Sequence, residues 1–160
     1  MRVFIKQNII IMTSKRIAAG IILFRKDRPN IEYLLLQTSY GEHHWTPPKG
    51  HLDEGENELE TAIRETKEES GLDIDLDYKI IDLKHRIELN YLVDKNKQKC
   101  VYYWIARLEH LKNPKVKLSD EHIDFKWADL EKAVELAKFN DMQEALRNSE
   151  KFIKENGFDV

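Results

Sequence analysis

Two short apolar runs, at residues 18–24 and 31–37, dominate the first quarter of the chain. Each run has the length of a buried β-strand, and the residues between them contain Pro29 and Asn30, which favour a turn. A polar loop rich in glycine and proline follows at residues 38–55. Loops of this composition beside strands often carry functional side chains, because the strands fix their ends.

Residues 57–70 predict the clearest helix. Asn57 stands at the N-cap position, and Glu60 three residues later completes a capping box. Gly71 supplies the left-handed residue that ends a helix. Apolar or small side chains recur at the spacing of one helical face, at Leu59, Ala62, Ile63 and Thr66. We therefore expect this face to be buried.

The second half of the chain again mixes strand and helix patterns. Residues 78–93 and 100–108 predict two strands around a polar turn at 94–98, and residues 123–127 predict a shorter strand. Two helices are expected at 130–138 and 142–155, the first with its apolar stripe at Leu130, Ala133, Val134 and Ala137. The predicted fold class is α/β (α+β), with mixed sheets sandwiched between helices.

Composition narrows the class of protein. The 160 residues suffice for one domain with its own core, and 41% of them are hydrophobic. The net charge of −3 argues against nucleic acid or an anionic membrane as partner. The single Cys100 excludes an intrachain disulfide, and no apolar run approaches the roughly 20 residues of a membrane span. We expect a soluble monomer in the cytoplasm, with a mitochondrial or nuclear pool left open.

The first 14 residues are expected to form a flexible extension. Basic residues such as Arg2 and Lys6 occur here, and the first acidic residue of the chain is Asp27. An organelle-targeting segment is the alternative interpretation, although the stretch has few serines and no clear amphipathic spacing.

The predicted helix carries an unusual negative charge. Residues 50–72 contain eight carboxylates and two basic residues, Arg64 and Lys67. Glu65, Glu68 and Glu69 fall within about a 100° arc of the helix, where they repel one another. A divalent cation would remove the repulsion, and oxygen ligands favour Mg²⁺ or Mn²⁺. The alternative is a solvated acidic face without a ligand.

The spacing of the segment decides between these alternatives. Gly50, then Glu56 after five residues, then residues 64–72 after seven more resemble the Nudix box, Gly-x5-Glu-x7-Arg-Glu-U-x-Glu-Glu-x-Gly-U, in which U is a bulky aliphatic residue. Thr66 stands at the first U position and departs from the pattern, while Leu72 satisfies the second. Because Thr66 lies on the buried stripe, we expect it to pack there.

The resemblance extends over roughly residues 15–154. Residues 37–40, 43–51, 88–91 and 118–122 are similar to the animal-type asymmetrical diadenosine tetraphosphate hydrolases, a branch of the Nudix family. The resemblance implies one Nudix domain over residues 15–157. It also implies Mg²⁺-dependent hydrolysis (Mn²⁺ as the alternative) of a dinucleoside polyphosphate, diadenosine tetraphosphate, to ATP and AMP by attack of water on a phosphorus.

The resemblance also implies roles for the acidic residues. The metal ligands would be Glu65, Glu68, Glu69 and Glu121. Glu69 is the expected catalytic base, with Glu121 as its rival, because a carboxylate near an acidified water can remove its proton. Arg64 is expected to orient the carboxylates by ion pairing.

Seven residues are expected to contact substrate. By resemblance, the polyphosphate would meet His44, Lys49 and Lys99, with His51 beside the metal. Tyr91 and Phe139 match the pair that encloses a purine, and Tyr40 lies in a matched run. The alternatives are ordinary surface cations and core rings, and Trp45, Trp104 and Trp127 are interpreted as core or scaffold.

Two other functions remain open at this point. One is a Nudix pyrophosphohydrolase acting on capped RNA or another nucleoside polyphosphate, although the chain lacks a clear basic stripe. The other is a non-catalytic nucleotide-binding Nudix module, against which the complete acidic set argues.

Overall fold

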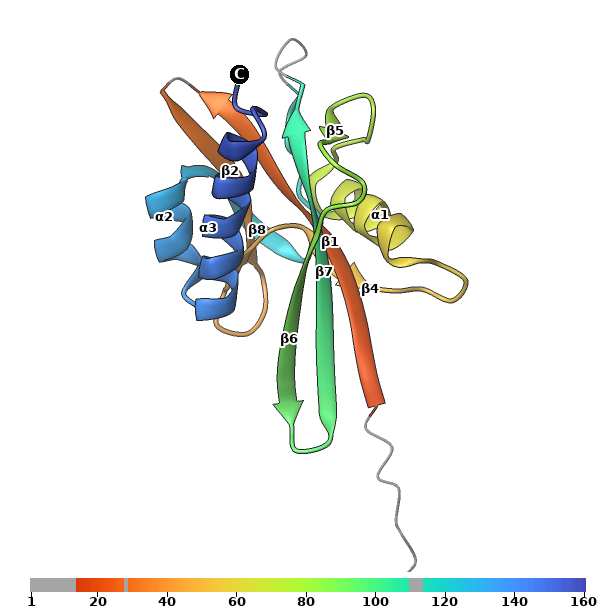
Figure 1. The fold of residues 1–160 in the computed structure, drawn as a ribbon. Helices are drawn as coiled ribbons and strands as arrows, with labels where there is room; N and C mark the ends of the chain where they lie inside the picture. The colour runs from red at the N-terminus through yellow and green to blue at the C-terminus, as the bar shows by residue number, and fades with distance from the viewer. Residues whose placement is uncertain (1–13, 28, 110–113) are drawn as a thin grey trace, which may run out of the picture.

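A computed structural model describes residues 14–27, 29–109 and 114–160 of the chain (Figure 1). The extension expected at residues 1–14 lies outside these ranges except for Ser14, which begins the first strand. The elements are β1 Ser14–Asp27, β2 Asn30–Thr38, β3 Trp45–Thr46, β4 Lys49–His51, α1 Glu58–Ser70, β5 Tyr78–Ile80, β6 Arg86–Asp94, β7 Lys97–Leu108, β8 His122–Asp129, α2 Leu130–Ala137 and α3 Asn140–Glu155.

The described strands form one mixed sheet. Its main path runs β3-β2-β1-β7-β5, while β4 pairs with β1, β6 with β7 and β8 with β2. The β1–β7 pair is parallel, and the other pairs are antiparallel. One edge of β1 pairs with β4 at Ala18–Gly20 and with β2 at Phe24–Asp27. Strands β2 and β4 therefore both pair with the same strand, β1.

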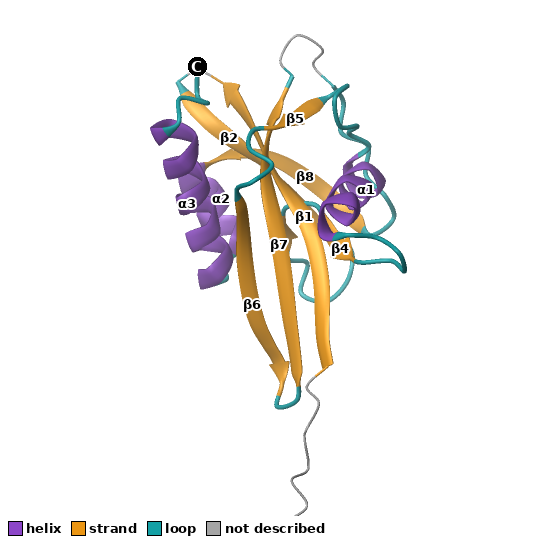
Figure 2. Cartoon of the chain, turned by 45° about the vertical axis from the view of Figure 1, so that its right-hand side comes forward, coloured by secondary structure: helices purple, strands orange, loops and turns teal. Residues whose placement is uncertain are grey.

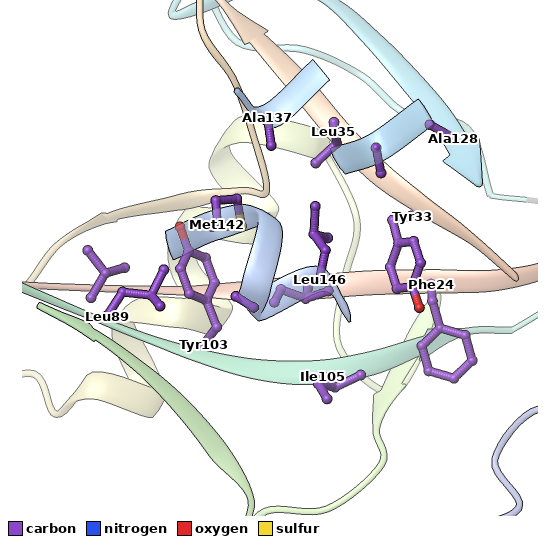
Figure 3. Close-up of a cluster of buried hydrophobic side chains, with 14 of the residues drawn as sticks. Phe24, Tyr33, Leu35, Leu89, Tyr103, Ile105, Ala128, Ala137, Met142 and Leu146 are labelled. Atoms are coloured by element: carbon purple, nitrogen blue, oxygen red, sulfur yellow. The ribbon is translucent and has the colours of Figure 1, made fainter. Parts of the chain in front are cut away.

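Helices cover both faces of this sheet, which confirms the predicted sandwich (Figure 2). The core between the sheet and helices α2 and α3 contains Tyr33, Leu35, Tyr103 and Leu146, all at most 1% exposed (Figure 3). A second core lies beneath α1 on the other face and includes Ile21, Leu34, Ala62, Leu72 and Trp104. Each buried aliphatic or aromatic side chain contributes about 1.5–3 kcal/mol to folding, so these two cores fix the sheet between its helices.

Helix α1 follows its sequence signals. The Asn57 side chain accepts a hydrogen bond from the Glu60 backbone N–H, the Glu60 carboxylate accepts one from the Asn57 backbone N–H, and Gly71 has φ 75°. Thr66 is fully buried, and its hydroxyl donates to the Ala62 carbonyl at 2.7 Å. The departure from the aliphatic position is thus accommodated, because the polar atom of Thr66 is satisfied within the helix.

The single strand predicted at 78–93 is wrong. It divides into β5 and β6, which both pair with β7, and residues 81–85 leave the ladder between the partners Ile80↔Ala106 and Arg86↔Trp104. Asp82 organises the excursion, since its carboxylate accepts the Lys84 N–H at 2.9 Å. Hydrophobic character continued through the excursion because Ile81 packs against the core, so the pattern concealed the break.

The loop predicted at 38–55 also contains strands. Trp45 and Thr46 pair with Gln37 and Leu36, and residues 49–51 pair with β1. Strands of two and three residues are too short to leave a periodic pattern. Through this pairing, β3 lies beside β2 and β4 lies beside β1.

Candidate active site

A cavity of about 800 Å³ opens on the α2–α3 face of the sheet. Its lining comes from β2, β3 and the loop between them, from β4, β6 and β7, and from α2, α3 and their connection: Thr38, Tyr40, His44, Trp45, Thr46, Lys49, Tyr91, Val93, Lys99, Val101, Tyr103, Ala137, Phe139 and Met142. Four of these residues also belong to the core, namely Val101 and the Tyr103, Ala137 and Met142 labelled in Figure 3. The volume is in the range of small-molecule sites, and the rigid floor preserves its shape.

Six of the seven predicted substrate residues line this cavity, namely Tyr40, His44, Lys49, Tyr91, Lys99 and Phe139. His51 is outside the lining, although it lies two residues beyond Lys49 on β4. Sequence separations of up to 99 residues are bridged by the sheet, which brings β4, β6 and β7 together around β1.

The two rings predicted to enclose a purine are both at the cavity. Phe139 lies between α2 and α3 as the N-cap residue of α3, and 55% of it is exposed. It meets the His44 ring edge-on, with centroids 5.1 Å apart. Tyr91 is half-buried, and burial with the nearby Asp141 carboxylate raises the pKa of its hydroxyl to about 12. Phe139 is therefore no core residue, and both rings can offer a face to a ligand.

Positive charge gathers beside the rings. Burial and the charges of Lys49 and Arg16 lower the pKa of Lys99 to about 8. Burial and the charges of Lys99, Arg16 and Lys49 likewise lower the pKa of His51. The lowered pKa values of Lys99 and His51 show that positive charge outweighs negative charge around them, so this wall of the site favours an anionic ligand.

The carboxylate predicted to be the base is buried next to the cavity. Glu69, on the last turn of α1, is 5% exposed and accepts the Lys49 backbone N–H at 3.0 Å. Burial raises the pKa of Glu69 to about 8, and the charges of Glu65 and Glu121 add to the rise against the Lys49 hydrogen bond. Burial, Glu69 and Glu121 also raise the pKa of the Tyr40 hydroxyl. Tyr40 therefore connects the cavity with the carboxylates.

Arg64 organises the acidic residues. Its Nε donates to Glu56 at 2.5 Å, and its Nη1 donates to Glu65 at 2.9 Å and Glu68 at 3.1 Å. The guanidinium and the Thr61 hydroxyl hold the pKa of the Glu56 carboxyl down at about 2. The sequence interpretation used Glu56 only as a position of the motif and gave it no role. Its fixed spacing from Arg64 was the signal that could have indicated their ion pair.

Gly50 lies where α1 approaches β4. A Cβ at Gly50 would lie 2.1 Å from the Glu65 carboxyl carbon, so any larger residue here would displace the Glu65 carboxylate. On the other face, a Cβ at Gly20 would collide with Lys49 and Tyr103. These two glycines let the acidic helix and the cationic strand lie back to back.

The carboxylates fit a hard divalent cation, though not in the conformation described. Within the described ranges, no three histidine, cysteine or acidic side chains converge on a common ligand position. Arg64 holds Glu65 and Glu68 instead, and the Lys49 N–H holds Glu69. The raised pKa values of Glu65 and Glu69 mark an excess of negative charge that a cation would relieve. The Glu68 side chain is exposed at its contact with Arg64, so it has room to turn towards such a cation.

Two residues at the site were missed by the sequence interpretation. Trp45 lines the cavity, with the Lys126 ammonium 5.0 Å from its ring centroid, instead of serving only as scaffold. His122 is buried with its Nε2 4.0 Å from the Glu69 carboxylate, and its Nδ1 has no hydrogen-bond partner in the described structure. Both lie in runs that carried the family resemblance, which was the signal for them.

Comparisons with known proteins agree with this geometry. The model of the NUDIX domain matches residues 14–148, and the chain therefore belongs to the Nudix family. Nudix hydrolases generally need divalent metal ions. Within the family, the chain is 46% identical over 142 residues to the mouse bis(5'-nucleosyl)-tetraphosphatase [asymmetrical], covering 85% of this chain and 94% of the mouse protein. The Caenorhabditis elegans protein of the same name is 45% identical over 137 residues, with 85% and 95% covered.

A solved structure gives the same result. The binary complex of a C. elegans Ap4A hydrolase superposes with a TM-score of 0.80 at 43% identity, covering 87% of this chain and 98% of that chain. Neither α1 nor any other helix within the described ranges has the length and hydropathy needed to cross a bilayer.

Proposed function

We propose that this protein hydrolyses diadenosine tetraphosphate asymmetrically, to ATP and AMP, with a divalent cation. The observation that carries the proposal is a cavity lined by an exposed ring, a half-buried ring and lysines, with the buried Glu69 bound directly behind its Lys49 wall. A nucleoside polyphosphate has the matching parts in the same order: a flat base, a polyanion and phosphorus atoms open to attack. The names of the mouse and C. elegans relatives support this substrate.

Binding begins with the adenine between Tyr91 and Phe139, where each stacked face contributes about 1–3 kcal/mol. Lys49, Lys99 and His44 then neutralise phosphate oxygens along the cavity. His51 lies on the same strand as Lys49 and adds to the positive potential beside the carboxylates. These contacts fix the position of the phosphorus relative to Glu69, and this positioning is itself a large part of the rate enhancement.

Glu65, Glu68, Glu69 and Glu121 would hold Mg²⁺, or Mn²⁺. When bound, the cation would neutralise phosphate charge and acidify water. Glu69 takes the proton from the attacking water; Glu121 is its rival for this role. The water oxygen forms a bond to phosphorus, the bridging P–O bond breaks, and the ATP oxygen leaves with the electron pair. Arg64 keeps the carboxylates in position throughout.

The proposal is tested by incubating the purified protein with Mg²⁺ and diadenosine tetraphosphate and separating the nucleotides by ion exchange. Equal amounts of ATP and AMP are expected, and chelation with EDTA should stop the reaction. Two ADP molecules per substrate would contradict asymmetrical cleavage, and binding without turnover would identify a non-catalytic module.

Solvent oxygen is expected to appear in AMP. When the two rings hold one nucleoside, the far end of the polyphosphate lies at the carboxylates. Water therefore attacks the phosphorus next to one adenosine. Hydrolysis in ¹⁸O-water followed by mass spectrometry distinguishes the products. Label in ATP would show that a different phosphorus is attacked.

Removing either ring is expected to weaken binding more than chemistry. In Tyr91→Ala and Phe139→Ala, KM should rise about ten- to a hundredfold, the equivalent of one stacking face. Phe125→Ala is the control, because this partly exposed ring on β8 is outside the cavity lining. Circular dichroism first confirms that each variant is folded. Unchanged KM and kcat in both folded variants would place the adenine elsewhere.

We also propose that the protein acts as a monomer in the cytoplasm. All lining residues of the cavity come from one chain, and Cys100 is buried as a free thiol, which suits a reducing compartment.

A further inference from the structure

Arg16 lies in one cross-strand row with two substrate residues. In the part of the sheet that extends beyond the helices, β6, β7 and β1 run side by side (Figures 1 and 2). Tyr91 of β6 pairs with Lys99 of β7, and Lys99 pairs with Arg16 of β1. Paired residues point to the same face of a sheet, and neighbouring strands are about 4.8 Å apart. Arg16 thus stands beside Lys99, on the side away from Tyr91.

The register between β1 and β4 places Arg16 close to the other cations as well. Ala18 pairs with His51 and Gly20 with Lys49, so these side chains share the face on which Arg16 lies two residues before Ala18. Arg16 is close enough to help lower the pKa of both Lys99 and His51. Arg16, Lys49, His51 and Lys99 therefore lie on one face of the sheet, beside the cavity that Lys49 and Lys99 line.

This group forms few contacts with acidic side chains, although the charge of Lys49 acts on Glu69. Among the residues that the structure describes, Arg16, Lys49 and Lys99 take part in no ion pair with a carboxylate, whereas Arg25 pairs with Glu32 at 2.8 Å and Arg64 with Glu56 at 2.5 Å. Like charges gathered without a partner cost stability unless an anion binds them. The alternative is that Arg16 is a solvated surface cation, and the experiment below separates the two.

We propose that Arg16 binds phosphates of the substrate chain beyond those that Lys49 and Lys99 reach, and that it thereby increases activity on dinucleoside polyphosphates with more than four phosphates. This inference rests on the proposed function. A chain held at one end by the rings and at the other near the carboxylates can accommodate additional phosphates only by looping out. The open side of Lys99 is where Arg16 lies, and a guanidinium binds two phosphate oxygens at once.

The test compares diadenosine tetra-, penta- and hexaphosphate as substrates of four proteins: wild type, Arg16→Ala, Arg16→Lys and Lys15→Ala. Lys15 is the matched control, because it is the adjacent exposed cation and pairs with Gln98 on the opposite face of the same strands. For Arg16→Ala, kcat/KM for the penta- and hexaphosphate should fall about tenfold, which corresponds to the loss of one charge-assisted hydrogen bond. For the tetraphosphate the loss should stay within about threefold, as a screened charge at a distance would produce.

The conservative variant and the control define the outcome. Arg16→Lys should recover only part of the lost activity, because it keeps the charge and loses the two-oxygen contact. Lys15→Ala should change the three substrates equally and little. An equal loss for all chain lengths in Arg16→Ala, or the same selective loss in Lys15→Ala, would overturn the proposal.

Binding without turnover keeps the inference separate from the proposed function. Calorimetric titration of diadenosine pentaphosphate in EDTA should show weaker binding to Arg16→Ala than to Lys15→Ala. Failure of wild type to hydrolyse any of the three compounds would contradict the proposed function, while this titration would still decide whether Arg16 binds the longer chain. Equal affinities of the two variants would overturn the role of Arg16.

Discussion

Replacing Glu69 by glutamine is expected to reduce turnover of diadenosine tetraphosphate by about a thousandfold or more while leaving the protein folded. The substitution keeps the shape of the side chain and its acceptance of the Lys49 N–H, but it removes a negative charge and a proton acceptor. General-base catalysis alone contributes about 10²–10⁴-fold, and a lost metal ligand adds to it. The loss should therefore appear in kcat, with a smaller change in KM.

The matched control is Glu58→Gln, on the first turn of the same helix and far from the cavity. Its activity should equal that of wild type. Turnover of Glu69→Gln within about tenfold of wild type would exclude Glu69 as base, since that loss is below the usual contribution of a catalytic base.

The metal-free stability of the two proteins should also differ with pH. The native pKa of Glu69 is raised to about 8, above its unfolded value near 4.5, so the native state binds more protons than the unfolded state between these values. Stability of wild type in EDTA should consequently fall as the pH rises from about 5 to 8. Glu69→Gln has no such group, so its Tm should fall less over the same interval. If the Tm of the two proteins changed with pH in parallel, ionisation of Glu69 would not destabilise the folded protein.

Local chemistry explains which parts of the fold could be predicted. Helix α1 was recovered with its cap, its capping box and its terminating Gly71, because each signal acts within a few residues of the helix. The break between β5 and β6 was missed because its cause is the pairing of both strands with β7, a partner distant in sequence. The two strands of the loop at 45–51 were missed because they are too short for a period.

The residues of the candidate site also divide into those that the local sequence predicts and those that depend on distant strand pairing. Spacing on the helix was enough to group Glu65, Glu68 and Glu69, whereas the resemblance to the hydrolase family selected Glu121 and most cavity residues. The position of Arg16 beside Lys99 could not be predicted, because it depends on the parallel register of β1 and β7, which are separated by 83 residues in that pair. The contact of Trp45 with the cavity depends in the same way on the pairing of β3 with β2. Contacts of this kind are decided by the sheet and not by the local pattern.

Arg64→Ala is expected to reduce kcat/KM by at least about a hundredfold, at the upper end of what outer-shell partners of metal ligands contribute. The guanidinium joins Glu56, Glu65 and Glu68, so its loss frees two predicted metal ligands at once. Glu56, whose side chain is 19% exposed, is then left without its partner. Arg64→Lys should restore little, because an ammonium cannot hold several carboxylates in one plane.

A second ion pair in the protein provides the control for this experiment. Arg25 and Glu32 are 2.8 Å apart with side-chain exposures of 30% and 20%, close to the 25% and 19% of Arg64 and Glu56, but they lie away from the cavity. Arg25→Ala should therefore leave kcat/KM near that of wild type. Glu56→Gln tests the mechanism, because a residue that acts by holding Arg64 should add little to the loss in Arg64→Ala when the two are combined. Additive losses in the double variant would mean that Glu56 acts independently of Arg64, and full activity of Arg64→Lys would reduce the role of Arg64 to its charge.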